Sequence, residues 1–295
     1  MVVGIDVGGT KIAGAVVARD SSLRATLTLP SPVAGAELID ALVGVVAHLR
    51  AQSSEPIRAV GLGVPSLIDA PTGRVAMTAN LDLADIDVRG VLTERLGIPV
   101  ALDNDGNLAA LGEHRVGAGR EHGDIVMLTI GTGVGGGLII GDKIFRGANG
   151  TGAELGHMVI QADGPRCQRN CPNHGCLETM VSGTAIARDA GMPAPEVVRR
   201  ANEGDGTCLA VLAQVGRYLG AGISGLANIF NPDAFIIGGG VSAAGDLILA
   251  PAIAEYRARA LPPNARAEVV LATLGPKAGM IGAGLLAWDL VDGNV

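Results

Sequence analysis

Residues 2–17 read VVGIDVGGTKIAGAVV, and residues 127–140 read MLTIGTGVGGGLII. In both segments an apolar run precedes a cluster of glycines, and a second apolar run follows the glycines directly. This pattern predicts a β-hairpin at each site and not a strand-to-helix turn. Glycines have no Cβ, so they let backbone N–H groups approach an anion closely. The two hairpins, one in each half of the chain, therefore indicate a phosphate chain held from both sides.

The first turn combines its glycines with an acid, a hydroxyl and a cation, in the order Asp6, Gly8, Gly9, Thr10 and Lys11. Its amides and Lys11 could hold phosphate oxygens, and Asp6 could hold Mg²⁺ through water. The alternative is an ordinary Gly-Gly hairpin with charged residues at an exposed tip. Phosphate binding is favoured by the second turn and by a third glycine cluster, which add Thr132, Gly133, Gly238, Gly239 and Gly240. The spacing matches neither a P-loop nor a Rossmann turn.

The composition is that of a globular protein with an aliphatic core. The chain has 295 residues, of which 48% are hydrophobic and only 2% aromatic, and its net charge is −7. This charge argues against nucleic acid or an anionic membrane as a partner, because both require a basic face. The β pattern begins at Val2 without a leader, and no apolar run looks long enough to span a membrane, so we expect a cytoplasmic protein.

Three of the four cysteines lie within ten residues, at Cys167, Cys171 and Cys176. In a reducing compartment such a cluster indicates a metal more than disulfides. With His157 the three thiols provide four ligands for a closed tetrahedral zinc site. His174 is a rival ligand, and free thiols are the alternative. Cys208 stands apart in a predicted helix, where it is most simply a small buried residue.

The predicted elements repeat along the chain. Each half begins with a hairpin and continues with strands and helices, which favours two α/β domains that face a cleft. Glycines at 117, 119 and 123 mark the boundary. Helices are expected at 36–50, 88–96, 208–229, 245–261 and 278–290, and strands at 57–64, 99–102, 234–237 and 269–272.

The segment Leu102-Asp103-Asn104-Asp105-Gly106-Asn107 follows a predicted strand and opens a helix. Active sites of open α/β sheets gather at such strand ends. A carboxylate there could take the proton from an attacking hydroxyl. The alternative is an N-cap, because Asp and Asn are favoured there for local hydrogen bonds. Asp103 or Asn107 could cap the helix while Asp105 does the chemistry.

Together these residues resemble the ROK family of sugar kinases and repressors, in particular its bacterial glucokinases. The resemblance covers nearly the whole chain, through 6–11, 80–81, 104–105, 130–147, 154–157, the cysteine cluster with Glu178, and 238–240. It implies an α/β fold of the actin-like (ribonuclease H-like) type, a duplicated two-domain ATPase fold with a cleft. The small α/β domain would comprise 1–115 plus 279–295, and the large one, with the zinc loop, 116–278.

The resemblance also implies an activity: ATP-dependent phosphorylation of glucose at its 6-hydroxyl. Asp105 would be the general base, and the sugar would be held by Asn80, Asn104, Asp105, Glu154, His157 and Glu178. The glycine turns would bind ATP with Mg²⁺, and structural Zn²⁺ would be bound by His157, Cys167, Cys171 and Cys176. A homodimer is implied as well.

Two departures from the family pattern leave alternatives open. Three residues separate Cys167 from Cys171 where one is usual, and Ser66 follows Pro65 where glycine is common. Another hexose, such as N-acetylmannosamine, mannose or fructose, or polyphosphate as the donor, would fit the same motifs. A non-catalytic, sugar-sensing protein is the rival of another class. A DNA-binding repressor is disfavoured, because the phosphate hairpin begins at residue 2 and the charge is negative.

Overall fold

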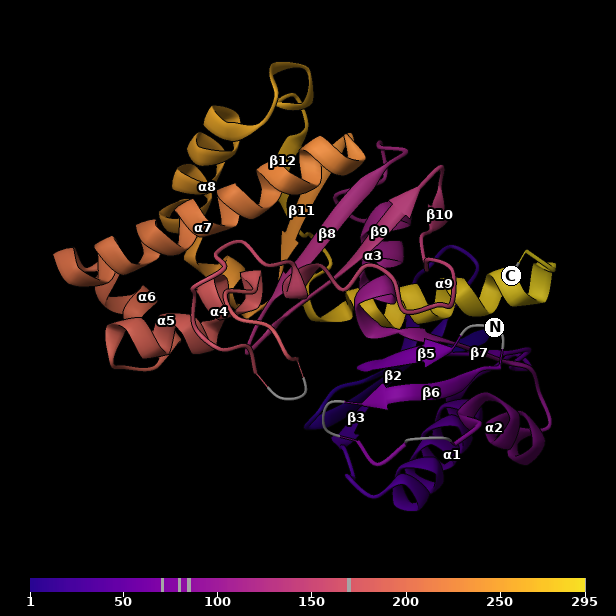
Figure 1. Cartoon of the computed structure of the whole chain (residues 1–295). Coiled ribbons are helices and arrows are strands. Elements are labelled where there is room, and N and C mark those ends of the chain that lie inside the picture. Colours follow the sequence, from indigo (N-terminus) through magenta and orange to yellow (C-terminus); the bar gives the residue numbers. More distant parts are fainter. Residues whose placement is uncertain (70–71, 79–80, 84–85, 169–170, 295) are drawn as a thin grey trace.

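The computed structural model describes residues 1–69, 72–78, 81–83, 86–168 and 171–294. Its described part contains two five-stranded sheets with the same topology (Figure 1). In each, the strands of the predicted glycine hairpin are antiparallel neighbours, and two further strands pair in parallel beside the first of them. The duplicated α/β architecture expected from the sequence is confirmed.

The first sheet has the order β3-β2-β1-β4-β7 and the second the order β10-β9-β8-β11-β12. The strands of the first are β1 (Val2–Val7), β2 (Lys11–Val17), β3 (Leu23–Pro30), β4 (Val60–Val64) and β7 (Val100–Asn104). Those of the second are β8 (Ile125–Ile130), β9 (Val134–Ile140), β10 (Lys143–Ile144), β11 (Ala234–Gly238) and β12 (Glu268–Leu271). The helices are α1 (Gly35–Gln52), α2 (Val88–Leu96), α3 (Asp105–Val116), α4 (Leu177–Val181), α5 (Gly183–Ala190), α6 (Ala194–Asn202), α7 (Gly206–Phe230), α8 (Asp246–Arg259) and α9 (Ala278–Asp292).

Successive side chains of a strand point to opposite faces of the sheet, so a strand that is apolar throughout needs a partner on each face. Both faces of each sheet are covered in this way. In β1, Val3 and Ile5 pack in the cluster that includes the apolar face of α1. Val2 lies in a different cluster, with Trp288 of α9. In the second sheet one face packs against α7 and α8, and the other against α3. Figure 1 shows α3 and α9 in the middle of the molecule, between the two sheets.

Glycines let α3 and α9 touch by their backbones. A Cβ on Gly282 of α9 would lie 1.7 Å from the carbonyl oxygen of Leu108, and one on Gly112 of α3 would lie 2.6 Å from that of Ala278. Any larger residue would push the helices apart, because real side chains do not approach so closely. The absence of Cβ atoms therefore determines how closely α3 and α9 pack.

The structure differs from the sequence expectations in three places. It adds the hairpin of β5 (Ser66–Asp69) and β6 (Arg74–Thr78) and the short edge strand β10, none of which has a clear alternating pattern. Its α7 has, by length and composition alone, the properties of a helix that could cross a membrane, which the sequence expectation did not anticipate. Half of its apolar window is buried inside the molecule, and Leu212 and Leu219 lie in the core, so core packing explains its apolar character.

The contact between α3 and α9 predicts a large effect for a single methyl group. We expect Gly282→Ala to lower the free energy of unfolding by about 3 kcal/mol, because the methyl has no space to enter. Gly44→Ala in α1 is the matched control, since a Cβ there meets nothing within 4 Å. That control should be neutral or stabilising by up to about 1 kcal/mol, because alanine favours helix. Urea unfolding of the two variants measures the difference, and equal values would contradict the packing argument.

Candidate active site

The first turn of α3 presents Asp105 directly after the end of β7. Asn104 is the N-cap, since its side-chain oxygen accepts hydrogen bonds from the backbone N–H groups of Gly106 at 2.8 Å and Asn107 at 3.2 Å. The expectation that Asp103 or Asn107 caps this helix is therefore wrong. Asp103 instead accepts a hydrogen bond from the Asn107 side chain at 2.9 Å. One oxygen of Asp105 also accepts the Gly106 N–H, at 2.9 Å, and its other oxygen is left for another use.

A cavity of about 620 Å³ brings together most of the polar residues predicted to bind a sugar. Its lining includes Asn104, Asp105, Gly133, Glu154, His157, Glu178 and Gly239, together with Ser66, Thr129, Gln168 and Asn173. These side chains come from both halves of the chain. A polyhydroxylated ligand would find carboxylates, amides and an imidazole around it, as sugar hydroxyls require.

A second cavity, of about 420 Å³, is lined mainly by backbone and small side chains. Its lining includes Asp6, the glycines at 238, 239 and 240, and Gly275, Pro276, Ala278 and Gly279. The two cavities share Asp105, Thr129 and Gly239. Asp105 therefore lies where a ligand in one cavity would meet a ligand in the other.

Burial makes the carboxylates at this junction harder to ionise. Burial is the main reason that the pKa of Asp6 is raised to about 7; the charge of Asp105 adds to the rise and Lys11 opposes it. Burial also raises the pKa of Asp105, against the lowering effect of the Gly106 N–H. Burial raises the pKa of Glu154 too, and the charge of His157 opposes this rise. Acids with raised pKa values in a cavity are typical of sites that bind cations or accept protons.

Glu178 connects the first cavity to the second glycine turn. It lies in the first turn of α4, and its carboxylate accepts a hydrogen bond from the backbone N–H of Val134 at 2.8 Å. A Cβ on Gly133 would lie 2.2 Å from that carboxylate, so glycine is needed for the approach. The carbonyl oxygen of Thr132 accepts a hydrogen bond from the Thr184 hydroxyl at 2.7 Å. The turn between β8 and β9 is thus held in place by α4 and α5.

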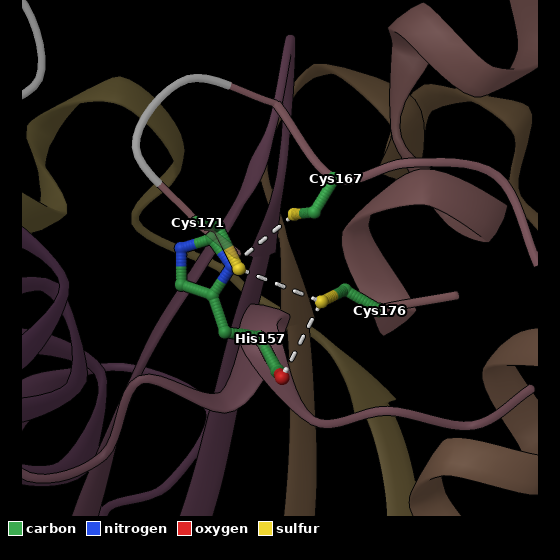
Figure 2. A group of neighbouring side chains, drawn as sticks. All are labelled: His157, Cys167, Cys171 and Cys176. Atoms are coloured by element: carbon green, nitrogen blue, oxygen red, sulfur yellow. Dashed lines mark hydrogen bonds between the residues drawn. The ribbon is translucent and has the colours of Figure 1, made fainter. Parts of the chain in front are cut away.

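His157 and the three clustered cysteines converge, as Figure 2 shows. Their ligand atoms all lie within 4.8 Å of one another. The Sγ atoms of Cys171 and Cys176 are 3.9 Å apart, and Sγ of Cys167 is 3.5 Å from Nδ1 of His157. Sulfurs bound to one tetrahedral zinc are about 4 Å apart, since each Zn–S bond is about 2.3 Å long. The rival ligand His174 instead makes a hydrogen bond with the carbonyl oxygen of Gly164, at 3.3 Å.

The first glycine turn is placed differently from the other predicted phosphate ligands. Gly9, Thr10 and Lys11 are exposed. Among the described residues that line the two cavities, Asp6 is present, whereas 8–11 and Thr132 are absent. Asn80 lies outside the described residues.

Arg146, which lies outside both linings, and the lining residues Gly275 and Gly279 were not predicted from the sequence. Arg146, in the loop after β10, binds the carboxylate of Asp103 at 2.7 Å and so joins the loop that leads to Glu154 to the strand end before Asp105. No spacing in the sequence relates these two residues, which are 43 positions apart. The glycines at 275 and 279 did carry a signal, as a fourth glycine cluster that precedes a helix.

The raised pKa of Asp6 predicts a pH-dependent stability. Between about pH 4 and pH 7, folded Asp6 keeps a proton that the unfolded chain has lost, so its contribution to stability falls as the pH rises. We expect Asp6→Asn to remove about 1–3 kcal/mol of this decrease. Urea unfolding of both proteins in magnesium-free buffer from about pH 4 to pH 8 measures it. Parallel pH curves would show that Asp6 ionises normally.

Several known proteins are similar to this chain in sequence and in fold. The glucokinase of Streptomyces coelicolor is 36% identical over 97% of this chain and 97% of its own length. The crystal structure of a ROK family glucokinase from Streptomyces griseus in complex with glucose and AMPPNP is 35% identical, with a TM-score of 0.85 over 98% of this chain and 99% of its own. The ROK hexokinase from Thermus thermophilus is 34% identical, with a TM-score of 0.89 over 99% of each chain. These matches confirm the actin-like fold. The ROK family profile matches residues 2–289, and the chain therefore belongs to the ROK family.

Proposed function

We propose that this chain is a glucokinase, which transfers the γ-phosphoryl group of ATP to the 6-hydroxyl of glucose. The observation that carries the proposal is that two cavities, one polar and one glycine-lined, meet at Asp105. The Streptomyces griseus relative, which contains glucose and AMPPNP, supports these two ligands. AMPPNP has the adenine, ribose and three phosphorus atoms of ATP.

The polar cavity would take the sugar. Asn104, Glu154, His157 and Glu178 would bind its hydroxyls, and Asn80 stays a predicted partner. Glu178 already accepts the Val134 N–H, so its remaining lone pairs face a ligand with a defined orientation. Discrimination among hexoses would depend on such fixed groups, because a buried group left unpaired by the wrong sugar costs binding free energy.

The glycine-lined cavity would take the nucleotide. Gly238 to Gly240 would lie against it, and the turns at 8–11 and 132–133 would contact the phosphates. Asp6 would hold Mg²⁺ through its hydration shell, and its place beside Asp105 fits a cation because two neighbouring carboxylates repel each other without one. The bound ion would neutralise phosphate charge, which is what phosphoryl transfer chiefly requires.

Asp105 would act as the general base. Its carboxylate would accept the proton of the sugar 6-hydroxyl as the hydroxyl oxygen bonds to the γ-phosphorus and the bond to the bridging oxygen of ADP breaks. The raised pKa of Asp105 makes its ionised form a stronger base than an ordinary aspartate.

His157, Cys167, Cys171 and Cys176 would hold a structural zinc. Burial raises the pKa values of the Cys167 and Cys176 thiols, so a cation is needed to keep them ionised. Four protein ligands leave no open position for catalysis. The zinc would hold the loop that precedes Glu178 and so shape the sugar cavity.

The proposed domain division, 1–115 with 279–295 and 116–278, is supported by the packing of α9 on β1 and β4 of the first sheet. The homodimer implied by the family resemblance and the cytoplasmic location expected from the sequence stay predictions. A sugar sensor without catalysis is the alternative, and turnover separates it from a kinase.

A coupled assay of ADP release tests the function. With Mg-ATP we expect kcat/KM for glucose to exceed that for mannose, fructose, N-acetylglucosamine and N-acetylmannosamine by about tenfold or more. Preference for another hexose would overturn the substrate but keep the kinase. Turnover with polyphosphate alone would overturn the donor, and sugar binding without any turnover would favour the sensor.

The same assay tests the proposed role of Asp105 as the general base. Asp105→Asn should lower kcat about 10³-fold while calorimetry still detects glucose binding. Asp246→Asn is the matched control, because Asp246 is the first residue of α8 as Asp105 is of α3 but lies outside both cavity linings. Near-normal turnover of Asp105→Asn would show that another group accepts the proton.

Metal analysis tests the zinc site. The wild type should carry about one zinc per chain, and Cys171→Ala should lose it. We expect that variant to bind glucose about tenfold or more weakly, because the loop before Glu178 loses its anchor. Cys208→Ala, in α7 and away from the cluster, should keep the metal. Full glucose affinity in a zinc-free Cys171→Ala protein would contradict the anchoring role.

A further inference from the structure

Glu113, near the C-terminal end of α3, has a fully buried carboxylate. One of its oxygens accepts hydrogen bonds from the backbone N–H groups of Ala118 at 2.9 Å and Thr273 at 3.1 Å, and from the Thr273 hydroxyl at 3.2 Å. The other accepts the Leu274 N–H at 2.7 Å. Hydrogen bonds to an ionised acceptor are the strong ones, and a buried charge requires them.

These partners lie on both segments by which the chain passes between its two halves. Ala118 belongs to the segment from α3 to β8, the first strand of the second sheet. Thr273 and Leu274 belong to the segment from β12 to α9, which returns to the first sheet. One side chain therefore ties the outward and the returning segments together. A Cβ on Gly117 would lie 2.1 Å from this carboxylate, so the local backbone is closely fitted around it.

The helix that carries Glu113 and the returning segment both line the glycine-lined cavity. Its lining takes Asp105, Gly106 and Ala109 from α3, and Ala272, Gly275, Pro276, Ala278 and Gly279 from the returning segment. Thr273 and Leu274, which are bonded to Glu113, lie between Ala272 and Gly275. The polar cavity is lined by no residue of this returning segment among those the structure describes. A change at Glu113 that moves the returning segment would therefore act first on the glycine-lined cavity.

We propose that Glu113 is a positioning residue for the nucleotide: it sets the returning segment, 272–279, at a fixed distance from the helix that carries Asp105. This inference rests on the proposed function, because it takes the glycine-lined cavity as the nucleotide site. Glu113 touches neither substrate in this assignment; it acts through the backbone of Thr273 and Leu274. If Glu113 only stabilised the fold, its substitution would lower stability but would not weaken the binding of one substrate more than that of the other.

Calorimetric titration with Mg-ADP, beside the KM values for ATP and glucose, tests the proposal. Glu113→Gln keeps the shape but removes the charge and turns an N–H₂ group toward N–H donors. We expect its Kd for Mg-ADP and KM for ATP to rise about tenfold, with KM for glucose changed less than about twofold. Thr273→Val, which removes only the hydroxyl donor, should shift nucleotide binding in the same direction by about threefold.

Asp233→Asn is the matched control. Its carboxylate accepts the N–H groups of Gly123 and Asp124, both at 3.0 Å, on the outward segment, but it does not bond to 272–279. It should lower the melting temperature and leave both substrates' constants unchanged. Glu113→Gln with wild-type Mg-ADP affinity, or with equal rises for ATP and glucose, would overturn the proposal. If Glu113→Gln does not fold, an unchanged Kd in Thr273→Val overturns it. If the wild type itself binds no Mg-ADP, the proposed nucleotide donor is overturned together with the role of Glu113. If the wild type binds Mg-ADP and the variants bind it equally well, only the role of Glu113 is overturned.

Discussion

The rest of this structure depends on close backbone contact between α9, α3 and the first sheet. Cβ atoms on Gly4, Gly61 and Gly282 would lie within 2.2 Å of carbonyl oxygens across these contacts. Because α9 lies so close to β1, its first turn reaches Asp6 at the end of that strand, and a Cβ on Gly279 would lie 2.5 Å from the Asp6 carboxyl group. The close packing of α9 against α3 and β1 thus brings together residues that line the glycine-lined cavity.

The carboxylates at the junction of the cavities lie in surroundings that disfavour their ionised forms. Asp6, Asp105 and Glu154 all have raised pKa values, with burial as the main cause; the charge of Asp105 adds to the rise for Asp6 and Glu154. Such an arrangement destabilises the ligand-free protein at neutral pH. It suits a site that receives a cation and hydroxyl groups, because these ligands remove the repulsion and restore the lost hydration.

Much of the architecture follows from local patterns in the sequence. Both glycine hairpins, the long helices and the cysteine cluster were predictable, because hydrophobic period, turn residues and ligand spacing act over short stretches of chain. The cap of α3 was predicted wrongly, since Asp103, Asn104 and Asn107 are all suitable capping residues. Which one caps depends on Asn107, whose side chain binds Asp103, and on Arg146, which comes from a distant loop.

By itself, the sequence determined the duplicated α/β pattern, the phosphate-type turns and the identity of the candidate base, Asp105. The tertiary structure alone decided that Asp105 borders both cavities, that Glu178 bonds to the second turn, that His157 and not His174 faces the cysteines, and that Glu113 ties two distant segments together. The physical reason is that hairpins and helices are specified by neighbours along the chain. Cavity walls and buried charge partners are specified by contacts between residues far apart in the chain, such as Glu113 and Leu274, which are 161 positions apart.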